Sequence, residues 1–99
     1  MQVVDFSFDS GHPAFAGHFP GQPIVPGVLL LDQAKKSVES ASGLSLGGLA
    51  AVKFLSPAGP GDALTMQYEI AAAEVRFTIH CADRTVAVGR FVIASGEGS

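Results

Sequence analysis

Cysteine, basic residues and long apolar runs are all scarce in this chain, and each scarcity excludes a class of protein. The single cysteine, Cys81, excludes an intrachain disulfide, and its alternating apolar surroundings predict a buried structural thiol rather than a nucleophile. Six basic residues against nine acidic ones give a net charge of −3, so the basic surface that nucleic-acid binding requires is lacking. No apolar run approaches the roughly 20 residues that cross a bilayer. We therefore expect a protein that neither binds nucleic acid nor spans a membrane.

The N-terminal residues 1–6 show no basic region followed by an apolar core, which is the pattern of a signal peptide. A lone thiol suits a reducing compartment, where structural disulfides are rare. These two features together predict a cytoplasmic protein.

Apolar residues are abundant for so short a chain. They make up 47% of the 99 residues, and the mean hydropathy is +0.37. A chain of this size buries only about two-thirds of the surface that its unfolded form exposes, so it cannot cover that much apolar surface alone. We expect a single domain over residues 1–99 that associates with another subunit and ends in a flexible tail at 95–99.

The segment 17–32 combines a rigid loop with the start of a helix. It reads Gly-His-Phe-Pro-Gly-Gln-Pro-Ile-Val-Pro-Gly-Val-Leu-Leu-Leu-Asp. Its prolines and glycines predict an ordered, functional loop. The residues after Pro26 predict a helix from Gly27 to about Ser42 that ends at Gly43, with a first turn buried on every side.

Three groups of this segment suit proton transfer next to a carbonyl group. His18 provides a base, because a neutral imidazole titrates near neutral pH. Asp32 provides an acid, and three leucines before it predict apolar surroundings that favour the protonated carboxyl group. Gly27 provides a backbone N–H at the helix start, where such groups lack a partner within the helix and carry the positive end of its dipole.

Alternating apolar residues predict a set of β-strands around this helix. The pattern begins near residues 4–8 and continues over residues 50–55, 64–70, 75–81 and 85–94, with Leu44 to Gly48 as a connection. The parity of the last strand shifts at Gly89, which predicts a β-bulge there. One strand, a long loop, one helix and an antiparallel meander indicate an α+β fold with a helix packed on a curved sheet.

The segment 17–32 resembles the active-site segment of the FabZ/FabA family, the (3R)-hydroxyacyl-[acyl-carrier-protein] dehydratases. The family pattern His-Phe-Pro-Gly-x-Pro-x-x-Pro-Gly-Val-Leu-x-x-Glu/Asp is matched without a gap from His18 to Asp32, a spacing of fourteen residues. A second stretch, Lys-Phe-Leu-Ser-Pro-Ala-Gly-Pro-Gly-Asp at residues 53–62, is similar to the family's Arg/Lys-Phe-x-x-Pro-x-x-Pro-Gly-Asp.

The resemblance implies a hotdog fold, in which a curved antiparallel sheet wraps a single central helix. It implies dehydration of (3R)-3-hydroxyacyl thioesters to trans-2-enoyl thioesters, in fatty-acid synthesis or a specialised polyene or polyketide route. The expected partners are an acyl carrier protein that presents the substrate and a second protomer, identical or paralogous. In this family each site takes its histidine and its acid from different protomers.

The resemblance also implies roles for individual residues. His18 and Asp32 are the expected catalytic pair, and the Gly27 N–H is the expected contact for the thioester carbonyl. The expected substrate-binding residues besides Gly27 are Pro26, Val28 and Phe19. We expect no cofactor and no metal, because no cluster of further metal-ligand side chains accompanies the two histidines of residues 9–23.

Lys36 departs from the family pattern, which has Gln four residues after the acid. At this spacing on a helix Lys36 either pairs with Asp32 or extends into solvent, and the sequence does not decide between them. Two alternative functions therefore stay open. One is a hotdog thioesterase that directs water at the thioester, and the other is a non-catalytic subunit that binds acyl chains or a partner.

Overall fold

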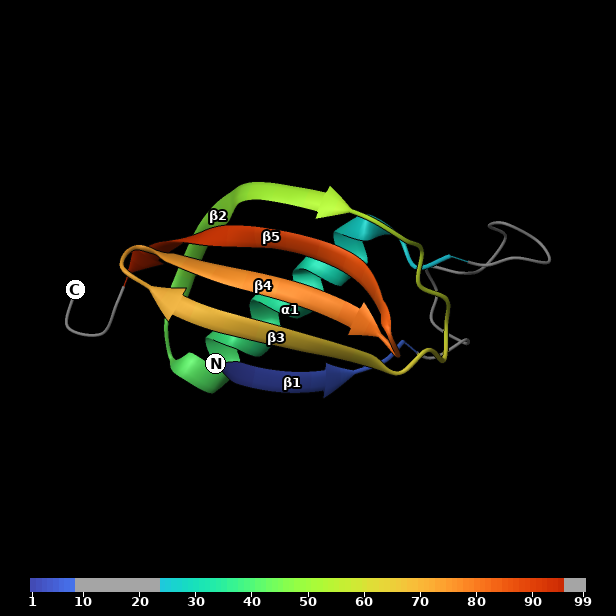
Figure 1. Ribbon diagram of the computed structural model, residues 1–99. Helices are drawn as coiled ribbons and strands as arrows, with labels where there is room; N and C mark the ends of the chain where they lie inside the picture. The colour runs from blue at the N-terminus through green and yellow to red at the C-terminus, as the bar shows by residue number, and fades with distance from the viewer. Residues whose placement is uncertain (9–23, 96–99) are drawn as a thin grey trace.

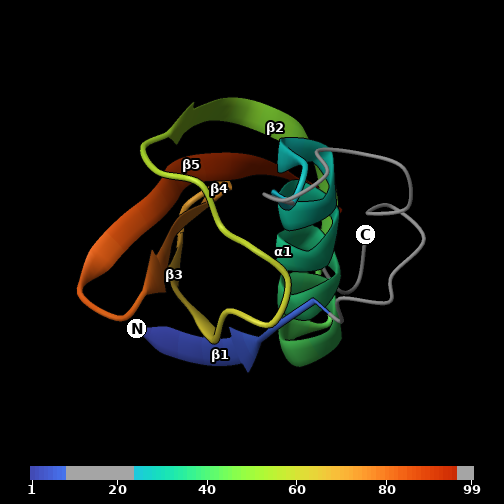
Figure 2. The ribbon, with the colours of Figure 1, turned by 90° about the vertical axis from the view of Figure 1, so that its right-hand side faces the viewer.

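The computed structural model describes residues 1–8 and 24–95 (Figure 1). Its elements in chain order are β1 (Gln2–Phe6), α1 (Gly27–Ser42), β2 (Ser45–Phe54), β3 (Leu64–Ala71), β4 (Glu74–Cys81) and β5 (Arg84–Ser95). The strands form one five-stranded sheet in the order β1-β3-β4-β5-β2, and all neighbours are antiparallel. Figure 2 shows this sheet curving around α1, with β1 and β2 at its two edges. The predicted α+β arrangement of one helix wrapped by a curved antiparallel sheet is confirmed.

Helix α1 has the predicted bounds. It begins directly after Pro26 and ends at Ser42, and Gly43 follows in the left-handed conformation with a φ of 79°. The Gly43 N–H donates to the carbonyl oxygen of Glu39 at 2.9 Å, which satisfies one of the last carbonyls of the helix. Glycine adopts this conformation without the steric penalty that a Cβ brings, so the chain reverses here into β2.

The core lies between one face of α1 and the concave face of the sheet. The helix contributes Leu30, Ala34 and Val38, which recur every four residues and so share one face. The sheet contributes these buried residues: Leu46, Leu64, Met66, Tyr68, Val75, Phe77, Ile79, Val86, Ala87 and Phe91. Cys81, predicted to be buried, lies at the end of β4 and is only partly covered.

The first turn of α1 is not buried on every side, contrary to the prediction. Val28 is 73% exposed, whereas Leu30 is 3% exposed. The sheet of one chain covers only one face of the helix, so an apolar residue on the opposite face stays in contact with solvent. Val28 is thus part of the apolar surface that, as the composition predicts, one chain does not cover by itself.

Strand β2 begins at Ser45, and the prediction of a connection between Leu44 and Gly48 is wrong. The two glycines in this stretch disfavour a strand by intrinsic propensity. Pairing with β5 overrides that preference, and it does so with register shifts between Ser45 and Leu46, between Leu46 and Gly48, and between Leu49 and Ala51.

The bulge of β5 lies at Val86 rather than at Gly89. Between β4 and β5 the pairing passes from Ile79 with Ala87 to His80 with Thr85, which leaves Val86 without a partner residue. Gly89 pairs regularly with Phe77. Its lack of a side chain serves close packing, since a Cβ there would lie 2.6 Å from the carbonyl oxygen of Ala51.

No helix in residues 1–8 and 24–95 has the length and apolar character needed to cross a membrane. Residues 96–99, which we expected to form most of a flexible tail, lie outside the described residues, and Ser95 ends β5.

Candidate active site

Four of the six predicted site residues lie on the described chain, all at the start of α1. Pro26 precedes the helix, Gly27 and Val28 open it, and Asp32 lies in its second turn. His18 and Phe19 lie outside the described residues. The structure therefore tests the surroundings of the carbonyl contact and of the acid.

An apolar pocket of about 440 Å³ lies beside the start of α1. Three segments line it: the residues before the helix, the first turn of the helix, and the end of β2 with the loop that follows. The lining residues are Ile24, Val25, Gly27, Leu30, Phe54, Leu55, Ser56, Pro57 and Ala58. We call this the helix-start pocket. Its apolar lining suits an acyl chain better than a charged ligand.

Gly27 faces the ring of Phe54, the last residue of β2. A Cβ on Gly27 would lie 2.7 Å from Cζ of Phe54, so the ring tip touches the glycine Cα region. The Pro26 carbonyl accepts the N–H groups of Leu29 and Leu30, at 3.0 and 3.3 Å. Within the described residues the Gly27 N–H has no hydrogen-bond acceptor. It thus lies at the edge of an apolar pocket as a donor that no described residue occupies.

Asp32 lies on a different face of α1 from the pocket. Its side chain is 53% exposed and pairs with Lys36, whose Nζ lies 3.0 Å from the Asp32 Oδ2. The prediction of apolar surroundings is therefore wrong for the single chain. The physical reason is helical periodicity, because Asp32 lies two residues from both Leu30 and Ala34, which carry the buried face. Of the two alternatives for Lys36, the structure shows pairing.

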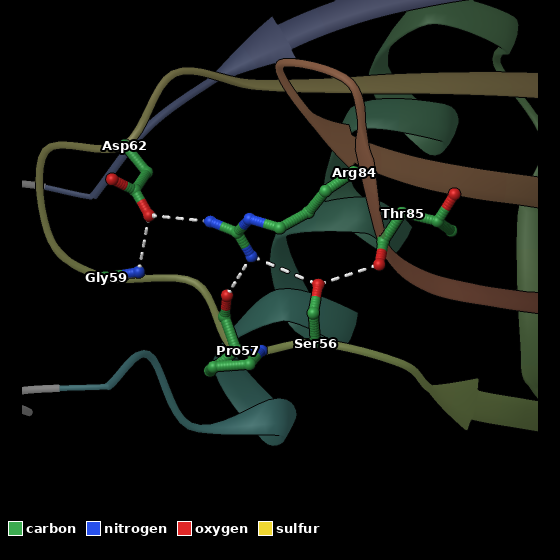
Figure 3. Close-up of polar contacts among 6 residues, drawn as sticks. All are labelled: Ser56, Pro57, Gly59, Asp62, Arg84 and Thr85. Carbon is green, nitrogen blue, oxygen red and sulfur yellow. Dashed lines mark hydrogen bonds and ion pairs between the residues drawn. The ribbon is translucent and has the colours of Figure 1, made fainter.

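A network around Arg84 fixes the loop between β2 and β3, which we call the 55–63 loop (Figure 3). The Arg84 guanidinium donates to the carbonyl oxygen of Pro57 and to Oγ of Ser56, the latter at 3.0 Å. Its other terminal nitrogen lies 3.7 Å from Oδ2 of Asp62. That same carboxylate oxygen accepts the N–H of Gly59 at 2.8 Å.

Sequence reasoning found part of this network and missed the rest. Asp62 ends the second motif, and Ser56 and Pro57 lie within it. Arg84 lies 27 residues after Pro57, and no spacing in the sequence links it to the motif. Only the antiparallel pairing of β2 with β5, which brings the start of β5 next to the loop, could have revealed it.

A second charged cluster lies on the outer face of the sheet. Arg76 and Arg90 are directly opposite each other on β4 and β5, and Glu74 pairs with both, at 2.6 and 3.2 Å. The hydrogen bond from Arg76 is the largest cause that lowers the pKa of Glu74, and Arg90 adds to it while desolvation opposes it. The cluster relieves repulsion between two arginines and is remote from the helix-start pocket, so we assign it no part in the site.

In the described parts of the chain, no three histidine, cysteine, aspartate or glutamate side chains are grouped closely enough to hold a metal ion. His80, the histidine of β4, is half-buried and does not line the helix-start pocket.

Comparison with known proteins places the chain in a family. The family model described as ApeI-like, ApeI dehydratase, matches residues 1–90. A curated relative, the 3-hydroxyacyl-[acyl-carrier-protein] dehydratase FabZ of Chlamydia trachomatis, is 36% identical over 100 residues, which cover 86% of this chain and 61% of the relative. The chain thus spans about three-fifths of the length of the first curated relatives it matches.

Solved structures agree with the family match. The dehydratase heterocomplex ApeI:P from Xenorhabdus doucetiae superimposes with a TM-score of 0.80 at 27% identity, covering 94% of this chain and 86% of that one. The fluoroacetyl-CoA-specific thioesterase FlK superimposes with a TM-score of 0.64 at 14% identity, covering 92% and 84%, and this likeness shows the fold alone. The predicted hotdog fold is confirmed. From the match over residues 1–90, with the motif and the fold, we conclude that this chain belongs to the ApeI-like dehydratase family.

Proposed function

We propose that the protein removes water from (3R)-3-hydroxyacyl thioesters carried on an acyl carrier protein and yields trans-2-enoyl thioesters. The single observation that carries the proposal is the start of α1, where the motif glycine has an N–H without an acceptor among residues 1–8 and 24–95, beside an apolar pocket of about 440 Å³. Fatty-acid synthesis and polyene or polyketide synthesis both use this reaction class. The cytoplasm is the proposed location, because carrier-bound intermediates and a lone thiol both suit it.

In the proposed mechanism the Gly27 N–H binds the thioester oxygen and so acidifies the neighbouring C2 proton. His18 removes that proton, and the carbanion electrons form the C2–C3 double bond as the 3-hydroxyl group leaves. A carboxyl group, that of Asp32, gives a proton to the leaving hydroxyl, which departs as water. The proton on His18 then returns to the carboxylate through solvent, so that one substrate gives one enoyl thioester and one water.

We propose that each site is completed by a second subunit. Asp32 is exposed and does not line the helix-start pocket of its own chain. Large apolar side chains are exposed around the same end of the molecule: Ile24, Val28, Phe54 and Leu55, at 39%, 73%, 48% and 52%. A homodimer, or a dimer with a paralogous hotdog subunit, would cover this surface and bring an Asp32 to a pocket from outside.

The decisive experiment measures conversion of a (3R)-3-hydroxyacyl carrier protein to the enoyl product by mass spectrometry. His18→Ala and Asp32→Asn should each abolish the product while size-exclusion chromatography shows the same assembly. His80→Ala and Asp83→Asn are the matched controls, and they should retain activity, since neither residue lines the pocket. No enoyl product from the wild type over several chain lengths would refute the proposal.

One observation favours a second candidate, a non-catalytic subunit that binds acyl chains. The Asp32 carboxylate is already engaged by Lys36 at 3.0 Å, whereas a proton donor must be free to approach the substrate. Acyl-thioester binding without turnover, with Lys36→Gln failing to create activity, would support this candidate. Release of free thiol in the same assay would instead identify a thioesterase.

A further inference from the structure

The 55–63 loop is hydrogen-bonded to Phe8, the last described residue before the stretch 9–23, and to Val25, two residues before α1. On one side, Gly61 donates its N–H to the carbonyl oxygen of Phe8 at 2.7 Å. On the other side, Ala58 accepts the N–H of Val25 at 2.7 Å. The side chains of these two bonded residues are buried in the core, with Phe8 7% and Val25 3% exposed. One short loop therefore ties the end of the β1 segment to the segment that leads into α1.

This loop has no regular structure of its own, so its shape depends on the side chains that brace it. Arg84 reaches it from the first residue of β5 and contacts it at both ends, through Pro57 and through Asp62 (Figure 3). Ser56 adds a third link, because its hydroxyl accepts from Arg84 and donates to the carbonyl oxygen of Thr85 at 2.7 Å. A planar guanidinium with several donors can make these contacts at once, whereas a lysine ammonium cannot reproduce the fork.

We propose that Arg84 is a positioning residue for the dehydration reaction. By bracing the 55–63 loop it fixes Val25, and through Val25 the position of the Gly27 N–H at the edge of the helix-start pocket. The connection to Gly27 is short, because Val25 lies two residues before the helix and its N–H donates to Ala58 of the loop. The proposal rests on the proposed function, since it assigns the brace a role in that chemistry.

The first arm of the test measures the brace itself and needs no activity. Amide hydrogen exchange by NMR reports on the Val25 and Gly61 N–H groups, whose acceptors are known. We expect faster exchange at both amides in Arg84→Ala. The amides of Met66 and Ile79, within β3 and β4, should keep their wild-type rates. Arg76→Ala removes an exposed arginine from the outer face of the sheet, and it should leave the exchange rates of all four amides unchanged.

The second arm measures kinetics on a pantetheine thioester, so that docking of a carrier protein plays no part. Misplacing a catalytic group by about 1 Å lowers the rate roughly 100-fold, so we expect kcat of Arg84→Ala to fall at least about tenfold. KM should rise less than kcat falls, because Gly27, Leu30 and Phe54 line the helix-start pocket from elements outside the loop. The kcat of Arg84→Lys should lie between that of the wild type and that of Arg84→Ala. The kcat of Arg76→Ala should match the wild type. If Arg84→Ala does not fold, Arg84→Lys and Asp62→Asn serve the same comparison.

The outcomes separate the two proposals. Wild-type exchange rates at Val25 and Gly61 in Arg84→Ala would overturn the brace. Faster exchange with an unchanged kcat would overturn its role in positioning. Absence of enoyl product from the wild type would refute the proposed function and with it the catalytic role of Arg84, while the exchange rates would still decide whether Arg84 braces the loop.

Discussion

The ring of Phe54 lies so close to Gly27 that a methyl group on the glycine would come within 2.7 Å of the ring's Cζ. The contact joins the end of β2 to the start of α1, which are far apart in sequence. The ring is 48% exposed, so it can move when a ligand or a second subunit arrives. Gly27 is therefore required for open space at the helix start rather than for a special backbone angle.

Gly27→Ala should lower activity with little loss of stability. The added methyl group meets the tip of a half-exposed ring, which can rotate away, and alanine favours the helix. The same methyl group occupies the approach to the Gly27 N–H, so kcat/KM should fall about tenfold or more. Thermal unfolding and enoyl formation measure the two effects, and an unfolded Gly27→Ala variant would contradict the expectation.

Phe54→Tyr should be more harmful than Phe54→Leu. A tyrosine carries its hydroxyl on Cζ, the atom that points at Gly27, whereas leucine shortens the side chain and leaves the contact open. We expect kcat/KM to fall in Phe54→Tyr and to stay near the wild-type value in Phe54→Leu. Ile70→Ala, an exposed apolar residue of β3 outside the pocket, is the control. Equal activities of the two Phe54 variants would show that the ring tip does not control access.

Two acids of α1 should respond in opposite ways to substitution. Asp32→Asn should remove activity, by about 100-fold or more if the residue is the general acid. Its exposed pair with Lys36 contributes only about 0.3–0.5 kcal/mol, so the melting temperature should hardly change. Glu39→Ala should instead lower the free energy of unfolding and leave activity largely unchanged. The Glu39 carboxylate accepts the Leu46 N–H at 2.8 Å, and losing this hydrogen bond costs about 1–3 kcal/mol. Enoyl formation measures the activity of both variants, and chemical denaturation measures their stability.

Gly89→Ala should destabilise the sheet. The new Cβ would lie 2.6 Å from the carbonyl oxygen of Ala51 and 2.8 Å from Cζ of Phe77, and the first of these is backbone that cannot rotate away. Overpacking of this kind costs about 1–3 kcal/mol, and each kcal/mol lowers Tm by about 4–8 °C in a domain of this size. Gly48→Ala is the matched control, since nothing lies within 4 Å of a Cβ there. A similar Tm for both variants would contradict the steric account.

Glu74→Gln should lower stability near neutral pH and lose that effect in acid. The pKa of Glu74 is lowered in the folded protein, chiefly by its hydrogen bond from Arg76, so its stabilisation is complete above the unfolded value of about 4.3. It disappears as the pH falls through the lower folded value, where the carboxylate takes up its proton. Melting curves of the wild type and Glu74→Gln should therefore converge as the pH is lowered, and a difference that persists in acid would contradict the linkage.

The sequence by itself determined the features that depend on neighbours along the chain. Pro26 and Gly43 set the bounds of α1, apolar alternation identified the strands, and the dense motif identified the family. Each of these signals is local, because capping, periodicity and motif spacing act within a few turns or strands. This is why the fold class and the helix bounds were predicted correctly.

Only the tertiary structure decided how distant segments meet. Pairing with β5 draws residues 45–49 into β2 against their intrinsic preference. The register between β4 and β5 places the bulge at Val86 and not at Gly89. The sheet covers only the face of α1 that carries Leu30 and Ala34, so Asp32 stays exposed beside Lys36, and the pairing of β2 with β5 brings Arg84 to the 55–63 loop. These outcomes depend on which face of the helix the sheet covers and on which strands become neighbours, and cross-strand packing sets both of them rather than the order of residues along the chain.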